Sequence, residues 1–260
     1  MTTPRPLGPA DLAIAQAVLA SVAEEMGEAL GRTAFSPNIK ERRDFSCAVF
    51  DASGQMVSQA AHIPVHLGAM PTAVRAVMAL APFEAGDVLA VNDPFLGGTH
   101  LPDVTTVAPV FLEDGDEPIG YVATRAHHAD IGGMAPGSMP VARELLQEGL
   151  VIPPIHLVRA GRIEESALAR SCNSRAPEER RGDFRAQLAA TALGAARLQA
   201  AAARFGLDGL RARFEVARAR GARDPRRDRR RSRTAATSSK TASRSTCHPR
   251  RRRQAGSTAS

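Results

Sequence analysis

The chain has 260 residues, of which 43% are hydrophobic, enough for one large domain or two small ones with a core. Aromatic residues make up 4% and tryptophan is absent, which argues against a base-stacking surface for single-stranded nucleic acid, and no apolar run approaches the ~20 residues of a membrane span. The net charge is +7, and the three scattered cysteines form neither a disulfide framework nor a CxxC metal pair, so we expect a soluble protein of the reducing cytoplasm.

The first elements along the chain are a predicted helix, a hairpin and a second helix. Residues 11–31 carry apolar side chains at helical spacing, with Asp11 as the candidate N-cap and Gly31 where a C-terminal glycine is expected. Residues 43–58 alternate between apolar and small or polar side chains around an Asp-Ala-Ser-Gly turn, which predicts a β-hairpin. A loop-like stretch follows, and residues 71–80 are then predicted to be helical.

A polar segment comes directly after the next predicted strand. Residues 86–91 read as a buried strand that leads into NDPFLGGTHLPD, residues 92–103. Asp93, His100 and Asp103 are side chains that a hard or borderline divalent metal prefers. The Asn-Asp-Pro and Gly-Gly pairs also suit an ordinary turn, so this segment alone does not decide between the two interpretations.

A second predicted hairpin makes the metal interpretation stronger. Residues 104–111 and 119–124 read as strands, and the second strand runs into RAHHAD, residues 125–130. An antiparallel hairpin returns its second strand to where the first began, and the glycine pairs Gly97-Gly98 and Gly132-Gly133 would let the backbone approach the site closely. We therefore expect a metal or acid–base site where these acidic and imidazole side chains meet: His100, Asp103, His127, His128 and Asp130.

The rest of the body contains a loop, short elements and a long helix. Residues 134–140 read as a loop, residues 144–150 as a helical turn, residues 151–163 as an extended segment and residues 183–205 as an alanine-rich helix. The chain has neither a Walker-type GxxxxGK[ST] motif nor a GxGxxG motif, so nothing marks a nucleotide site of those kinds.

The last 44 residues differ from the body in composition. Residues 217–260 hold 15 of the 34 Lys and Arg residues but only two acidic residues, and they lack hydrophobic periodicity. We interpret this segment as the product of a shift in reading frame near residues 216–221, because out-of-frame GC-rich DNA gives an Arg-, Ser- and Thr-rich product. The alternatives are a genuine disordered tail and an arm that binds nucleic acid.

Four segments carry a resemblance to a known family. FSPNIKERRDFSCAVFDASGQMVSQAAHIPVHLGAM, NDPFLGGTHLPDVTTVAPVF, RAHHADIGGMAPGSMP and LLQEGLVIPP resemble, in this order, the hydantoinase B/oxoprolinase family. The resemblance covers roughly residues 10–216, and members of the family are considerably longer. We therefore expect an α+β fold with mixed or antiparallel sheets, β-hairpins and flanking helices in residues 1–216, truncated relative to the family, and a disordered basic tail in residues 217–260.

The resemblance implies chemistry that is shared between two subunits. A hydantoinase A-type ATPase partner phosphorylates the carbonyl oxygen of a small cyclic amide, and the B-type partner completes hydrolysis of the activated intermediate. We therefore expect a B-type subunit of an ATP-dependent hydrolase that opens hydantoin or 5-oxoproline, with ATP used by the partner and with no membrane or specific nucleic-acid partner. The alternatives are an acetone- or acetophenone-type carboxylase subunit and a non-catalytic truncated remnant.

The resemblance also implies a divalent metal (manganese, zinc or iron) and the residues that serve it. The positions matching the family's metal ligands are Glu41, His100, Asp103 and His127. His128 is the alternative to His127, and it is also a catalytic candidate together with Asp93, Arg125 and Asp130. The two carboxylates would orient imidazoles, and Arg125 would hold an anionic intermediate or neutralise Asp130.

The remaining histidines and one cysteine receive lesser roles. His62 and His66 are expected to line the pocket or to stabilise their loop. Cys47 alternates as a strand residue does and is expected in the core. His156 is expected to be structural.

Overall fold

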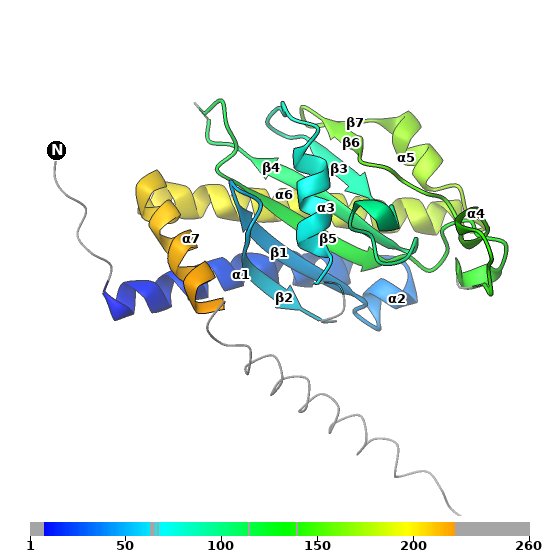
Figure 1. Cartoon of the computed structure of the whole chain (residues 1–260), viewed down its shortest axis with the longest axis horizontal. Coiled ribbons are helices and arrows are strands. Elements are labelled where there is room, and N and C mark those ends of the chain that lie inside the picture. The colour runs from blue at the N-terminus through cyan, green and yellow to red at the C-terminus, as the bar shows by residue number, and fades with distance from the viewer. Residues whose placement is uncertain (1–7, 63–65, 67, 114, 139, 222–260) are drawn as a thin grey trace, which may run out of the picture. The chain divides into compact units, whose positions relative to one another are not determined.

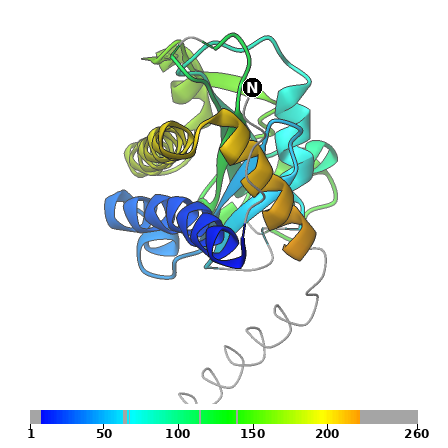
Figure 2. The same ribbon diagram turned by 90° about the vertical axis from the view of Figure 1, so that its left-hand side faces the viewer.

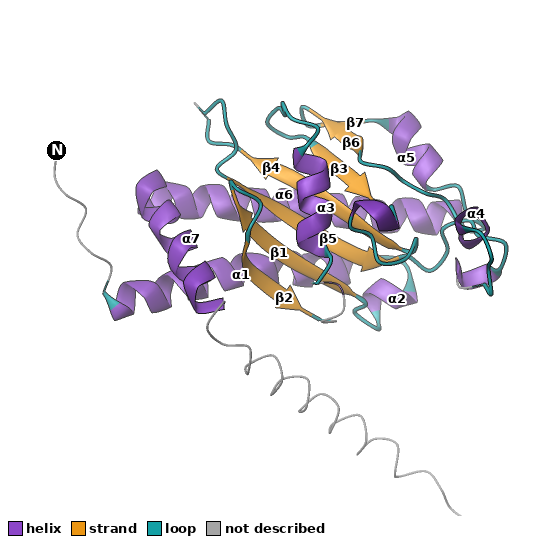
Figure 3. Cartoon of the chain, viewed as in Figure 1, coloured by secondary structure: helices purple, strands orange, loops and turns teal. Residues whose placement is uncertain are grey.

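A single seven-stranded sheet organises the part of the chain that the computed structural model describes, namely residues 8–62, 66, 68–113, 115–138 and 140–221 (Figures 1 and 3). The strands are β1 (Phe45–Asp51), β2 (Met56–Ala61), β3 (Val88–Val91), β4 (Asp103–Val110), β5 (Gly120–His127), β6 (Ile155–Arg159) and β7 (Arg162–Ile163). Their order across the sheet is β2-β1-β5-β4-β3-β6-β7, and every neighbouring pair is antiparallel. The predicted α+β class and both predicted hairpins are confirmed.

Helices cover both faces of this sheet. The long helices α1 (Pro9–Thr33) and α6 (Pro177–Phe205) lie side by side on one face, and α3 (Met70–Met78) lies on the other (Figure 2). The other helical elements are α2 (Pro37–Lys40), α4 (Leu145–Glu148), α5 (Glu165–Ser171), α7 (Leu207–Gly221) and the 3₁₀ turns η2 (Pro94–Leu96) and η3 (Pro136–Ser138). Among the described helices, none is long and apolar enough to cross a membrane.

The covered faces explain why the central strands are apolar along their whole length. Successive side chains of a strand point to opposite faces, so a strand with a helix on each side is buried on both. In β5, Val122 and Ala126 join the core under α1 and α6, while Tyr121 and Ala123 join the core under α3. This alternation decides which side chains of β4 and β5 can meet at the end of the sheet.

Helix α1 extends beyond the predicted bounds at both ends. Gly8 is its N-cap, and the Asp11 carboxylate accepts the Gly8 backbone N–H at 3.0 Å, so Asp11 stabilises the first turn from inside the helix. Gly31 lies within the helix, where a Cβ atom would stand 3.3 Å from the Phe45 ring. The expectations for Asp11 and Gly31 were therefore wrong in position, because the glycine serves packing against β1 and does not terminate the helix.

The C-terminal helices also differ from the sequence expectation. Helix α6 begins at Pro177, before the predicted start at residue 183, and α5 was not predicted. The predicted domain boundary at residue 216 falls within α7, which continues to Gly221. The rest of the predicted basic tail, residues 222–260, lies outside the described residues.

Candidate metal centre

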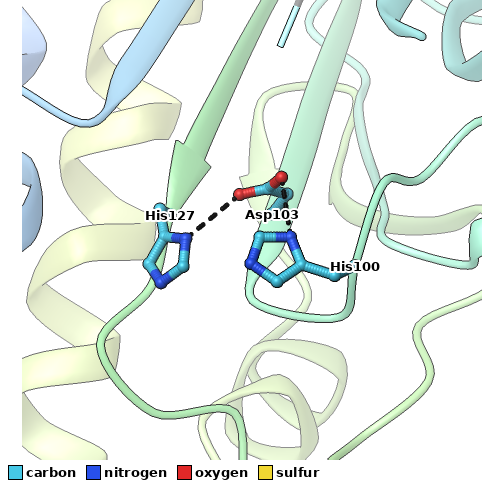
Figure 4. Close-up of side chains that lie close together, drawn as sticks. All are labelled: His100, Asp103 and His127. Carbon is cyan, nitrogen blue, oxygen red and sulfur yellow. Dashed lines mark hydrogen bonds and ion pairs between the residues drawn. The ribbon is translucent and has the colours of Figure 1, made fainter. Parts of the chain in front are cut away.

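The β4–β5 hairpin pairs the first residue of one strand with the last residue of the other. Asp103 stands opposite His127, and the register continues without a break to Val110 and Gly120. The predicted convergence of the two segments is thus confirmed. His100, in the turn before β4, completes a group of three side chains whose potential ligand atoms all lie within 4.8 Å of one another (Figure 4).

The Asp103 carboxylate lies at the centre of this group and is almost completely buried, with 3% of its side chain exposed. Its Oδ2 atom accepts a hydrogen bond from His100 Nδ1 at 2.9 Å and another from the Thr99 hydroxyl. Its Oδ1 atom lies 3.3 Å from His127 Nδ1 (Figure 4). The carboxylate therefore links the two imidazoles, which approach it from different segments.

Two further residues join the group in the structure. His66 Nε2 lies 3.5 Å from Asp103 Oδ1 and 3.4 Å from Asp44 Oδ1, and Asp44 Oδ2 lies 4.0 Å from His127 Nδ1. Asp44 comes close because β1 pairs with β5, and the His127 backbone N–H donates to the Asp44 carbonyl at 2.9 Å. We name the five side chains the imidazole–carboxylate cluster: Asp44, His66, His100, Asp103 and His127.

Electrostatics in the cluster favour an ionised Asp103. Burial alone would raise the pKa of its carboxyl, but the three neighbouring imidazoles and the Thr99 hydroxyl hold that pKa well below its ordinary range. In return, the hydrogen bond to Asp103 raises the pKa of His100, against the opposing effect of partial burial. At neutral pH, Asp103 is therefore a fixed negative charge at the end of the sheet.

Glu41 and His128 do not join the cluster. Glu41 is exposed at the C-terminal end of α2, and within the described residues its carboxylate forms no ion pair. His128 is completely buried on the opposite face of the sheet, where its Nε2 atom lies 2.8 Å from Gln187 Oε1. Burial lowers the pKa of His128 to about 4, so this imidazole is neutral at physiological pH. The structure thus does not bring these two residues to the cluster, and Asp44 is the acidic residue of KERRD that lies there.

The other carboxylates with predicted roles, Asp93 and Asp130, hold loops. Asp93 caps the turn η2 by accepting the Phe95 backbone N–H at 2.9 Å. Asp130 accepts the Gly132 backbone N–H at 2.9 Å and forms an ion pair with Arg175 at 3.2 Å. The contacts seen for both carboxylates therefore involve loop backbone or Arg175, and Asp103 is the carboxylate that orients the imidazoles.

Arg125 lies in the interior of the protein. Its side chain is completely buried, and each of its three guanidinium nitrogens donates to a protein oxygen. The guanidinium that binds Asp130 is that of Arg175. Arg125 therefore directs all three guanidinium nitrogens to oxygen atoms of the protein.

The glycine pairs bring loops close to neighbouring backbone. Gly97 has a positive φ of 95°, and a Cβ atom there would collide with the backbone nitrogen of Ala73 at the start of α3. A Cβ atom at Gly133 would collide with the Glu148 carbonyl of α4. Both glycines thus permit close packing between segments of this chain.

The donor set fits a divalent metal. Asp103 Oδ1 is buried and has no hydrogen bond of adequate geometry, although two imidazole nitrogens lie within 3.5 Å of it. A buried acceptor without a partner is costly, and a cation beside it would remove that cost. Imidazole nitrogens and carboxylate oxygens are together typical ligands of zinc, manganese and non-haem iron.

The same arrangement suits proton transfer. When a neutral imidazole donates Nδ1–H to a carboxylate, its Nε2 atom carries the free lone pair, which can bind a metal or accept a proton. His100 is placed for this role because its Nδ1 faces Asp103 while 32% of its side chain remains exposed. The tautomer follows from the hydrogen-bond partner.

The model of the Hydantoinase B/oxoprolinase family matches residues 8–241 of the chain, beyond the predicted boundary at residue 216. An uncharacterised Methanocaldococcus jannaschii protein, MJ0963, is 46% identical and covers 68% of this chain. The 5-oxoprolinase of Saccharomyces cerevisiae is 49% identical over 56% of this chain, and a putative D-/L-hydantoinase B-type component of Pseudomonas sp. is 36% identical over 76%. These matches span 32%, 12% and 34% of the respective relatives, so the chain corresponds to about a third or less of their length.

Solved structures agree with this relationship. The ATP-dependent caprolactamase of Pseudomonas jessenii superposes with a TM-score of 0.74 at 31% identity, over 82% of this chain and 37% of that chain. A nucleotide-free acetone carboxylase shares the fold, with a TM-score of 0.71 at 22% identity over 80% of this chain and 28% of that chain. The family match, the relatives and the fold all agree: the chain belongs to the hydantoinase B/oxoprolinase family.

Proposed function

We propose that the chain acts as a B-type subunit of an ATP-dependent cyclic-amide hydrolase, and that the imidazole–carboxylate cluster is its metal and acid–base centre. The relatives support the substrate class, since they include a 5-oxoprolinase and a putative hydantoinase component, and a structural neighbour is a caprolactamase. The observation that carries the proposal is the placement of His100, Asp103 and His127 within reach of one ion at the end of the β4–β5 hairpin.

The proposed reaction begins on a partner subunit. A hydantoinase A-type ATPase transfers a phosphoryl group from ATP to the carbonyl oxygen of a hydantoin or of 5-oxoproline. Water then adds to that carbon and loses a proton to a base, which leaves a tetrahedral carbon bearing a hydroxyl group, the phosphoryl oxygen and the ring nitrogen. The C–N bond then breaks as the hydroxyl group loses its proton to a base and a proton is delivered to nitrogen, which opens the ring to an acyl phosphate. A second water hydrolyses the acyl phosphate to a carboxylate and inorganic phosphate.

The cluster supplies the groups that this reaction needs. Where it does not bind the metal, the Nε2 lone pair of His100 can accept a proton from water, and ionised Asp103 stabilises the resulting imidazolium through Nδ1. A proton on the same imidazole can later be delivered to the leaving nitrogen. A bound divalent metal would polarise the carbonyl group and lower the pKa of a coordinated water.

The proposal is tested by reconstitution. The purified chain is mixed with a hydantoinase A-type ATPase subunit, and ring opening of 5-oxoproline and hydantoin is measured together with phosphate release. We expect ATP-dependent ring opening that Asp103→Asn reduces at least ~100-fold, the scale typical of acid–base groups. His156→Asn is the matched control, because His156 also faces a buried aspartate, with its Nε2 atom 3.5 Å from Asp87 Oδ2, but lies outside the cluster. Carboxylation of acetone without ring opening, or equal activity of the two variants, would contradict the proposal.

A further inference from the structure

Arg125 is one of two arginines among the described residues whose side chains are completely buried; the other is Arg180. A buried guanidinium is costly unless hydrogen bonds and opposite charge compensate for its lost hydration. Arg125 lies on β5 two residues before His127, and therefore on the same face of the sheet as that imidazole. Arg125 is therefore a buried charge next to the cluster.

The guanidinium connects three segments. Its Nε atom donates to the Thr105 hydroxyl at 2.7 Å, directly across the β4–β5 ladder. Its Nη2 atom donates to the Gly97 carbonyl at 2.6 Å, and its Nη1 atom donates to the His66 carbonyl at 3.3 Å. Each bond has a different direction, as the planar fork of a guanidinium permits.

Each of these segments carries part of the cluster. Thr105 follows Asp103 by two residues on β4, and Gly97 precedes His100 by three residues in the same turn. The third acceptor belongs to His66 itself. The positive charge of Arg125 also interacts favourably with the Asp103 carboxylate. The Arg125 side chain therefore bonds to all three segments that carry Asp103, His100 and His66.

We propose that Arg125 is the positioning residue of the imidazole–carboxylate cluster, fixing His66 and the turn before His100 against β4. The expected effect of Arg125 on metal binding rests on the proposed function. The expected effect of Arg125 on the orientation of the histidine rings does not. The position needs an arginine, because lysine keeps the charge but carries one compact ammonium group that cannot span three divergent acceptors.

Two pairs of matched variants in the full chain test this role. Arg125→Lys is compared with Arg180→Lys, because Arg180 is equally buried but pairs with Asp183 at 2.9 Å within α6. Thr105→Val is compared with Thr106→Val, which also removes a buried hydroxyl but on the opposite face, where Thr106 bonds to Thr124 at 2.7 Å. The two variants of each pair both disturb a buried side chain and so share a general loss of stability. Only the first variant of each pair removes a contact to a segment that carries part of the cluster.

The first measurement is a cobalt(II) titration followed by visible absorption. We expect Arg125→Lys to raise the cobalt dissociation constant about 10- to 100-fold, as is typical when a residue that supports metal ligands is altered. Thr105→Val should give a smaller increase in the same direction. Arg180→Lys and Thr106→Val should stay within about twofold of wild type even if they lower the melting temperature.

The second measurement follows the imidazole rings by long-range ¹H–¹⁵N NMR of metal-free protein. Positioning by Arg125 predicts shifted ring signals for His66 and His100 in Arg125→Lys, with the same signals unchanged in Arg180→Lys. If wild-type protein binds no cobalt, the proposed metal centre is contradicted. The ring signals of the metal-free protein still test the positioning role of Arg125 in that case. Ring signals of Arg125→Lys that match wild type would overturn the positioning role.

Discussion

His127 and His128 are consecutive residues whose imidazoles lie on opposite faces of the sheet. His127 Nδ1 lies 3.3 Å from Asp103 Oδ1 on the face covered by α3, whereas His128 Nε2 lies 2.8 Å from Gln187 Oε1 on the face covered by α6. Gln187 in turn donates to the Val104 carbonyl and to the Thr124 hydroxyl. Of the two histidines, the first therefore belongs to the cluster and the second fastens α6 to the β4–β5 hairpin.

This division predicts opposite effects of two neighbouring substitutions. His128→Ala removes a buried hydrogen bond and leaves a cavity, so we expect it to lower the free energy of unfolding by about 2–4 kcal/mol. It should change the cobalt dissociation constant less than about threefold. His127→Ala should instead weaken cobalt binding at least about tenfold at a cost in stability below about 1 kcal/mol. Urea unfolding and cobalt titration of both variants check this, and a reversed pattern would refute the division.

A second matched pair lies within KERRD. Asp44 reaches the cluster through His66 and His127, whereas Glu41 is exposed on the end of α2. We expect Asp44→Asn to weaken cobalt binding at least about tenfold, because it removes a negative charge that stabilises a cation and the imidazoles around it. Glu41→Gln should bind cobalt as wild type does. Loss of binding in Glu41→Gln alone would restore the ligand assignment expected from the sequence.

The packing of the turn before His100 gives a prediction about stability. Gly97→Ala would force both a positive φ and a collision with the Ala73 backbone, so we expect a loss of about 3 kcal/mol or more in the free energy of unfolding. Gly161→Ala is the control, since Gly161 also has a positive φ, 76°, but no atom lies near its missing Cβ. That substitution should cost only about 1–2 kcal/mol of backbone strain. Equal losses in denaturant unfolding would show that the turn is not seated against α3 as described.

The two buried cysteines should be unreactive in the folded protein. Burial raises the pKa of the Cys47 thiol far above its ordinary value and that of Cys172 to about 11, so the reactive thiolate is scarce at neutral pH. In a Cys247→Ser protein, we expect no reaction with a thiol reagent until denaturant is added, after which both thiols should react. Rapid labelling of either thiol in the native state would contradict the burial of that cysteine in the core.

The hairpins could be predicted from the sequence because local signals determine them. Alternating side chains and a polar turn fixed the β4–β5 pairing, and the pairing then placed Asp103 beside His127. The cluster was therefore accessible to a simple geometric argument. Asp44 could not be found in this way, because β1 pairs with β5 across a long stretch of sequence and not through a hairpin turn.

Other features depend on tertiary packing that the local sequence does not encode. Gly31 suited a helix end, yet Phe45 from β1 packs against it inside α1. His127 was the preferred match to the family motif and His128 the alternative, and the burial of His128 against Gln187 is a tertiary feature that the motif does not encode. The anchoring role of Arg125 requires three acceptors from distant segments, which no spacing rule brings together.

The proposed function depends most on a metal ion held by the imidazole–carboxylate cluster. Elemental analysis of the purified chain after incubation with manganese, zinc or iron and removal of unbound ions tests this directly. We expect about one ion per chain in wild type and in His156→Asn, and at least about tenfold less in Asp103→Asn, which loses the central charge. Equal metal content in wild type and Asp103→Asn would contradict the central claim.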